Sequence, residues 1–265
     1  MFMSPARAAR GKGTRGRAAI FTVLTLAVAT ATGCDFFSIS GESRLQLFAS
    51  HHGAPDDTGA FPDYGVDDAP RTFTTGEGWE VILEKGVAVI VGARILSCDG
   101  AAAIELDTPF GPYPEDFRMQ DLEVMNIAEG VLDPAEYCTI EVEFGPYTVA
   151  ALEGVDTPHD VNNPAVLENS TVYLRGRATR GDEIVDFEYR TPETAVATLD
   201  ISTLQDGGPV LVEKSDTCTI NLTIVKTYDT LLADVDFATA TSEAIGEALV
   251  QTLVDETYAI YGTSQ

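Results

Sequence analysis

Basic residues and the usual metal-binding residues are scarce in this chain of 265 residues. It contains 42 Asp and Glu but only 16 Lys and Arg, with three histidines, four cysteines and one tryptophan. Nucleic-acid binding needs clustered cations that neutralise phosphates, so this charge balance argues against a nucleic-acid partner. The Cys and His spacing of a structural zinc site is also missing.

The common catalytic signatures are missing as well. The sequence has no Gly-x-Ser-x-Gly elbow, no His-Glu-x-x-His, no phosphate-binding glycine loop and no Ser-x-x-Lys. We therefore predict that the protein is not an enzyme. A hydrolase that uses two carboxylates is a less favoured alternative, because so many acids supply pairs by chance.

The sequence also lacks a long apolar run, and its N-terminal apolar stretch is short. Five cations and no acid occupy residues 1–17, and an uncharged apolar stretch follows at Ala18–Ala31. This stretch is shorter than the roughly 20 residues that span a bilayer. A basic region, a short apolar run and small residues are typical of a secretory signal peptide.

The end of this segment, Ala31-Thr32-Gly33-Cys34, resembles the lipobox of bacterial lipoproteins. The resemblance implies cleavage before Cys34 and lipidation of its sulfur. We therefore expect a signal peptide at 1–33, a lipidated cysteine with a tether at 34–43, and a single β-rich domain at 44–265. The lipid on Cys34 would anchor the protein to a bacterial membrane, its only expected partner, and the domain would face the periplasm or the cell exterior. An ordinary secreted protein is the alternative.

Removal of residues 1–33 takes away five cations and no acid, which leaves a net charge of −31. Such a surface attracts cations and interacts weakly with anionic headgroups. Solubility in a saline habitat explains this charge more simply than cation binding does, because salt screens the self-repulsion.

Alternating apolar residues and regularly spaced turns dominate the predicted domain. This pattern favours a mainly β fold, an antiparallel β-sandwich or a barrel-like domain. A loop is expected at 50–70 and one C-terminal helix at 241–260, where apolar residues recur at helical spacing. The segment 119–128 is compatible with a helix or a strand. The strands are expected at 44–49, 72–75, 79–83, 87–96, 104–106, 137–144, 171–178, 184–189, 195–201, 210–212 and 218–225.

Three cysteines remain if Cys34 carries lipid, so the exported domain can form one disulfide. Cys98 and Cys138 each lie at the end of an apolar strand-like run, and we favour their pairing over the two alternatives. Cys218 alternates with apolar residues in its strand, which is typical of a buried and inert thiol.

The three histidines are the candidate metal ligands. His51 and His52 lie in a loop beside Asp56 and Asp57, and His159 lies in a second turn-rich segment. Imidazole binds copper, zinc or nickel, and carboxylates complete such sites. Adjacent residues of an extended chain point to opposite faces, so one histidine of the pair would bind. A solvated loop without metal or any other cofactor is the competing interpretation.

Two weaker resemblances involve longer segments. Residues 71–99 and 132–144 look like recurrent elements of uncharacterised lipoproteins from myxobacteria and their relatives. The layout also loosely resembles the copper-protein family encoded beside methanobactin genes. These resemblances imply a β-sandwich surface lipoprotein with copper affinity, but no ligand is carried over residue by residue.

We therefore expect a lipid-anchored cell-envelope protein that acts as a non-enzymatic binding or structural module. The alternative is a periplasmic lipoprotein that binds copper or another transition metal through His51, His52 and His159.

Overall fold

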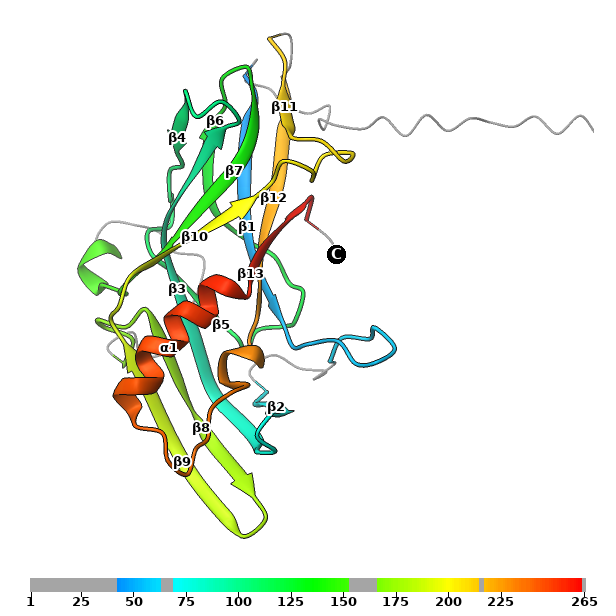
Figure 1. Ribbon diagram of the computed structural model, residues 1–265. Helices are drawn as coiled ribbons and strands as arrows, with labels where there is room; N and C mark the ends of the chain where they lie inside the picture. Colours follow the sequence, from blue (N-terminus) through cyan, green and yellow to red (C-terminus); the bar gives the residue numbers. More distant parts are fainter. Residues whose placement is uncertain (1–41, 63–68, 153–165, 215–216, 264–265) are drawn as a thin grey trace, which may run out of the picture. The chain divides into compact units, whose positions relative to one another are not determined.

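The computed structural model describes residues 42–62, 69–152, 166–214 and 217–263. These residues form a mainly β fold with two sheets and one α-helix (Figure 1). The expected fold class is confirmed, and the two sheets form a sandwich rather than a closed barrel. Residues 1–41, which include the predicted signal peptide and Cys34, lie outside the described residues.

The smaller sheet, sheet A, has four strands in the order β13-β12-β1-β6. The outer strands β13 and β6 pair antiparallel with their neighbours, but β1 and β12 pair in parallel. This parallel pair differs from the antiparallel arrangement that the sequence predicts. Its strands are β1 (Arg44–His52), β6 (Met125–Val131), β12 (Thr219–Thr227) and β13 (Thr257–Tyr261).

The larger sheet, sheet B, has nine strands and is organised by β3 (Glu80–Ser97). Register shifts at Leu83/Lys85 and at Ile90/Gly92 let this one strand pair with several short neighbours. Its other strands are β2 (Arg71–Thr74), β4 (Ala103–Glu105), β5 (Tyr113–Asp116), β7 (Ala135–Phe144), β8 (Val172–Arg180), β9 (Glu183–Thr191), β10 (Ala195–Asp200) and β11 (Val210–Val212).

The C-terminal helix, α1 (Ser242–Asp255), packs against β9 and β10. Its Ile245, Leu249 and Leu253 are buried in the same core cluster as the facing strands of both sheets. The helix is shorter than the expected 241–260, because the β-branched and aromatic residues that follow it form β13 and pair with β12. Two short 3₁₀ turns, η1 (Val149–Leu152) and η3 (Thr230–Leu232), complete the described elements.

One further expectation differs from the structure, and one open alternative is decided for part of its segment. The predicted loop at 50–70 begins later, because β1 continues to His52 and keeps its pairing with β12 to the end. The ambiguous segment 119–128 ends in strand β6, and it is preceded by a turn in which Leu122 has a φ of 66°. Among the described residues, no helix is long and apolar enough to cross a membrane.

Candidate functional site

The end of β1 brings the two adjacent histidines into very different surroundings. Leu45, Leu47 and Ala49 alternate along the strand with their side chains buried in the core. His51 continues this row into the space between the sheets, while His52 belongs to the opposite face. Both side chains are nonetheless buried, with exposed fractions of 3% and 4%.

His51 takes part in a buried cluster of charged groups that connects the two sheets. In sheet A it is the register partner of Lys226, which extends the apolar row of β12. Glu115 comes from β5 of sheet B and contacts both: its Oε1 lies 3.0 Å from His51 Nδ1, and its Oε2 lies 2.5 Å from Lys226 Nζ. All three side chains are at most 3% exposed. An ion cluster of this kind fixes how two layers dock, because each charge is costly to leave unpaired.

A second buried ion pair continues this cluster. The Arg71 guanidinium lies 3.3 Å from Asp121 Oδ1 and also donates to the Met119 carbonyl oxygen. The same carbonyl oxygen lies 3.2 Å from His51 Nε2. Asp121 Oδ2 accepts hydrogen bonds from the Tyr228 hydroxyl and from the Gly53 backbone N–H. We call His51, Arg71, Glu115, Asp121 and Lys226 the interlayer cluster.

His52 makes a separate set of contacts on the other face of sheet A. Its Nδ1 lies 2.8 Å from the Gly53 carbonyl oxygen, and its Nε2 lies 2.8 Å from the Tyr258 hydroxyl. The ring of Phe61 packs edge-on against it at 4.7 Å between centroids. Burial raises the pKa of the nearby Asp229, although hydrogen bonds from backbone N–H groups such as that of Ala54 oppose the shift.

The two predicted metal ligands that the structure describes, His51 and His52, do not converge on a common point. His51 and His52 face opposite sides of sheet A, and every ring nitrogen is within hydrogen-bond distance of a protein group. Within the described parts of the chain, no group of three His, Cys, Asp or Glu residues could hold a metal ion. His159 lies outside the described residues.

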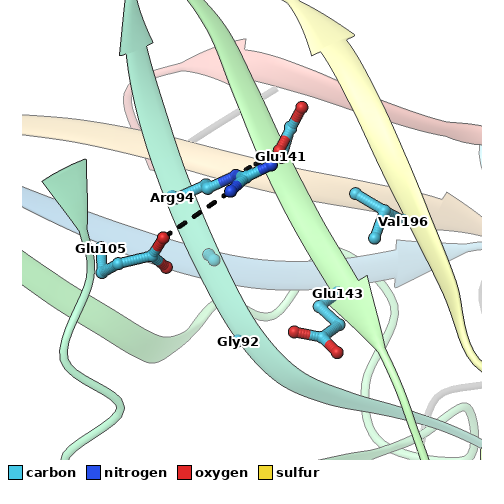
Figure 2. Close-up of a pocket in the computed structure, with 7 residues that line it drawn as sticks. Gly92, Arg94, Glu105, Glu141, Glu143 and Val196 are labelled. Atoms are coloured by element: carbon cyan, nitrogen blue, oxygen red, sulfur yellow. Dashed lines mark hydrogen bonds and ion pairs between the residues drawn. The ribbon is translucent and has the colours of Figure 1, made fainter. Parts of the chain in front are cut away.

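A pocket on the outer face of sheet B is lined by residues of β3, β4, β7 and β10 (Figure 2). Arg94 of β3 donates to Glu141 of β7 and lies 3.8 Å from Glu105 of β4, as the dashed lines show. The hydrogen bond from Arg94 to Glu141 and the charge of that carboxylate raise the pKa of Arg94.

The floor of this pocket is open because Gly92 has no side chain. The Glu143 carboxylate lies 3.4 Å from the position that a Cβ at Gly92 would take, and Val196 of β10 forms the apolar rim. Ala93 completes the lining. Among the described residues Glu143 makes no ion pair, so its carboxylate is available to a ligand.

The cysteines confirm one prediction and contradict another. Cys98 and Cys138 form a disulfide at the end of the β3–β7 ladder, as expected. Cys218 is also disulfide-bonded, so the expectation of a free buried thiol is wrong. Its partner lies outside the described residues. The apolar alternation of β12 correctly indicates that Cys218 is buried, but burial says nothing about whether a sulfur is bonded.

Sequence reasoning missed four of the five residues in the interlayer cluster. A signal for Lys226 does exist, because it follows Ile220, Leu222 and Ile224 at the spacing that places it on the core-facing side of a strand. Arg71, Glu115 and Asp121 give no such signal. Arg71 and Glu115 belong to strands of four residues and Asp121 to a turn, and their burial depends on residues far away in the sequence.

Comparison with solved structures finds MbnP from Methylosinus trichosporium, at 12% sequence identity and a TM-score of 0.38. The match covers 75% of this chain and 80% of that chain. No protein-family model and no curated protein matches the chain. The resemblance to the methanobactin-associated family is thus supported only as a distant structural match, which carries no argument about a ligand. The lipobox and the myxobacterial resemblance stay predictions.

Proposed function

We propose that this chain is a module of a bacterial cell envelope that binds a cationic ligand on the outer face of sheet B. The observation that carries the proposal is the pocket at Gly92. It combines an open floor, an apolar rim at Val196 and the available Glu143 carboxylate, in a chain with a large excess of acids.

The chemistry of the pocket favours an ammonium or guanidinium group. Arg94 makes its ion pairs with Glu105 and Glu141, so Glu143 interacts with it only through the longer-range attraction of their charges. A carboxylate binds a ligand cation through charge-assisted hydrogen bonds, which are stronger than neutral ones. The net negative charge of the chain attracts such a ligand from a distance at low ionic strength.

The test is a titration of the exported protein with a tetra-arginine peptide, followed through the backbone amide resonances. We expect shifts at Gly92, Glu143 and Val196, and weaker binding in Glu143→Gln. Glu80→Gln is the matched control, because it removes the same charge from an exposed position on β3. Equal weakening by both variants, or shifts spread evenly over the surface, would reduce the effect to nonspecific charge attraction and contradict the pocket.

A lipid anchor is predicted only by the lipobox-like sequence that ends at Cys34, and the disulfide bond of Cys218 opposes it. One sulfur cannot carry a thioether and a disulfide at once. Because the sequence has only four cysteines, lipidation of Cys34 and an intramolecular disulfide at Cys218 exclude each other. Mass spectrometry of the unreduced exported protein decides between a lipid-modified Cys34 and a Cys34 linked to Cys218. The second result would leave a secreted module without this anchor.

The alternative function, binding of copper or another transition metal, would require the histidines to leave their present partners. A metal at His51 Nδ1 would have to displace the contact with Glu115, and one at His52 Nε2 would have to displace that with Tyr258. The described geometry therefore favours the outer-face pocket over a histidine metal centre.

A further inference from the structure

The contact between Lys226 and Glu115 in the interlayer cluster does not have the geometry of a hydrogen-bonded ion pair. Lys226 Nζ lies 2.5 Å from Glu115 Oε2, but the two atoms are not aligned as donor and acceptor. In the parts of the chain that the structure describes, neither atom has another hydrogen-bond partner. An ammonium group carries three donors, and leaving them unsatisfied inside a protein is costly. An ordinary buried salt bridge therefore explains this pair poorly.

Water is kept away from the two side chains. Both are 1% exposed. His51 Nδ1 lies 3.0 Å from Glu115 Oε1, so it holds the carboxyl group from the side opposite Lys226. The rings of Phe117 and Tyr228 pack against His51 and are themselves buried. Solvent can therefore neither stabilise the two charges nor hydrolyse a bond between the two groups.

An amine and a carboxyl group that are held in contact can condense to an amide. The neutral amine of a lysine is a nucleophile. Well-oriented groups within one molecule react as if each were present at roughly 10⁵–10⁸ M. An amide carries no charge, so its formation also removes the cost of burying two ions.

We propose that Lys226 and Glu115 are joined by an isopeptide bond, which cross-links the two sheets covalently. The new bond connects Lys226 Nζ to Glu115 Cδ, and the bond from Cδ to Oε1 breaks. Two of the three ammonium hydrogens leave with Oε1 as one water molecule, and the third stays on the amide nitrogen. The positive and the negative charge disappear together, and no oxidant or cofactor is needed.

The bond would hold the layers of the sandwich together. Glu115 belongs to β5 of sheet B and Lys226 to β12 of sheet A, so the bond closes a long loop of the chain. A covalent cross-link restricts the unfolded chain, and the effect grows with the length of the loop. The excess of acids in this chain repels itself at low ionic strength, and a covalent link between the sheets resists that repulsion.

Lys85 and Asp116 provide an internal control, because Asp116 follows Glu115 directly in β5. Lys85 Nζ donates a hydrogen bond to Asp116 Oδ2, and Arg118 forms an ion pair with the same oxygen. The side chains of Lys85 and Asp116 are 14% and 20% exposed, so water reaches them. We expect this pair to remain a salt bridge.

The test is mass spectrometry of the purified protein after its cysteines have been reduced and alkylated. We expect a mass that is lower by one water molecule than the chain requires. Trypsin cleaves after a lysine only when its amine is free, so the digest should contain a branched peptide that joins the segments around Glu115 and Lys226. Cleavage after Lys85 should proceed normally. A full mass with cleavage after Lys226 would overturn the proposal, and so would a water loss located elsewhere in the chain.

Lys226→Arg is the matched variant, because it keeps the positive charge but lacks the amine that forms the bond. We expect the full mass, two separate peptides and a lower urea midpoint of unfolding than in the unmodified protein. A loss of water that persists in Lys226→Arg would contradict the assignment to this pair. If the variant does not fold, the mass and the digest of the unmodified protein still decide the question.

Discussion

At the scale of single residues, the interlayer cluster is the part of the molecule most sensitive to substitution. Lys226 is 1% exposed, and its ammonium group contacts a carboxylate that is also 1% exposed. Breaking a buried pair by removing one partner leaves an uncompensated charge, which typically costs about 3–5 kcal/mol.

We predict that Lys226→Ala lowers the free energy of unfolding by about 3–5 kcal/mol, measured by urea denaturation at neutral pH. The matched control is Arg177→Ala, which breaks the ion pair with Asp186 on the exposed face of sheet B. Such pairs contribute about 0–1 kcal/mol. Similar losses for both variants would contradict the structural role of the cluster.

The lowered pKa of Asp116 leads to a second prediction at this scale, on how the stability of the fold depends on acidic pH. Burial by itself raises the pKa of Asp116, but the Arg118 hydrogen bond and the Lys85 charge outweigh it, so its pKa lies below the usual 3.8. A lowered folded-state pKa gives stability that is present above the unfolded-state value and is lost as pH falls through the folded-state value.

Asp116→Asn should therefore destabilise the protein at neutral pH, and the difference from the unmodified chain should shrink below about pH 4. Urea midpoints measured at neutral pH and at about pH 3 check this. A difference that stays constant over this range would mean that the Asp116 charge does not contribute.

At the scale of elements, β3 and β8 approach each other closely at a glycine. A Cβ on Gly176 would lie 2.1 Å from the Ile82 backbone oxygen. This oxygen is part of the strand backbone and cannot move aside as a flexible side chain could. Gly176→Ala should separate the two strands and destabilise the protein by about 1–3 kcal/mol or more. Gly208→Ala is the control, since its nearest neighbour would be at an ordinary 3.6 Å. Thermal unfolding of both variants checks the prediction.

The disulfide closes the segment that carries β4, β5 and β6. This segment supplies Glu115 and Asp121 to the interlayer cluster, and the two sulfurs are separated by 40 residues in sequence. A cross-link over a loop of this length contributes on the order of 3–4 kcal/mol in the chain-entropy account. The double variant Cys98→Ser with Cys138→Ser should lose stability on that scale in chemical denaturation. A loss below about 1 kcal/mol would show that the β3–β7 ladder alone holds the segment.

Local sequence pattern predicted the long elements well and the short ones poorly. The alternation in 87–96 and 137–144 places strands where β3 and β7 lie, because their apolar faces are continuous. The separate strands expected at 79–83 and 87–96 are one strand in the structure. A register shift between Leu83 and Lys85 lets the strand continue through the charged residues and the glycine that separate the two segments. The parallel β1–β12 pairing joins residues about 175 positions apart, and no local pattern contains that information.

At the scale of the whole molecule, the histidines show why the predicted metal site and the observed cluster differ. Composition and local spacing indicated that His51 and His52 were the strongest metal-binding pair in the chain. The sequence could not show that β1 continues through both, or that Glu115 and Lys226 meet His51 from distant strands. In the fold, His51 instead contacts Glu115 and Met119, and His52 contacts Gly53 and Tyr258.

The measurement that tests the account most directly is elemental analysis of the purified protein with copper and zinc titration, on the unmodified chain and on His51→Ala with His52→Ala. The account holds that both histidines act within the fold, so it predicts no tightly bound metal at one per chain. One copper or zinc per chain, bound tightly and lost in the double variant, would contradict it and make the histidines the functional centre.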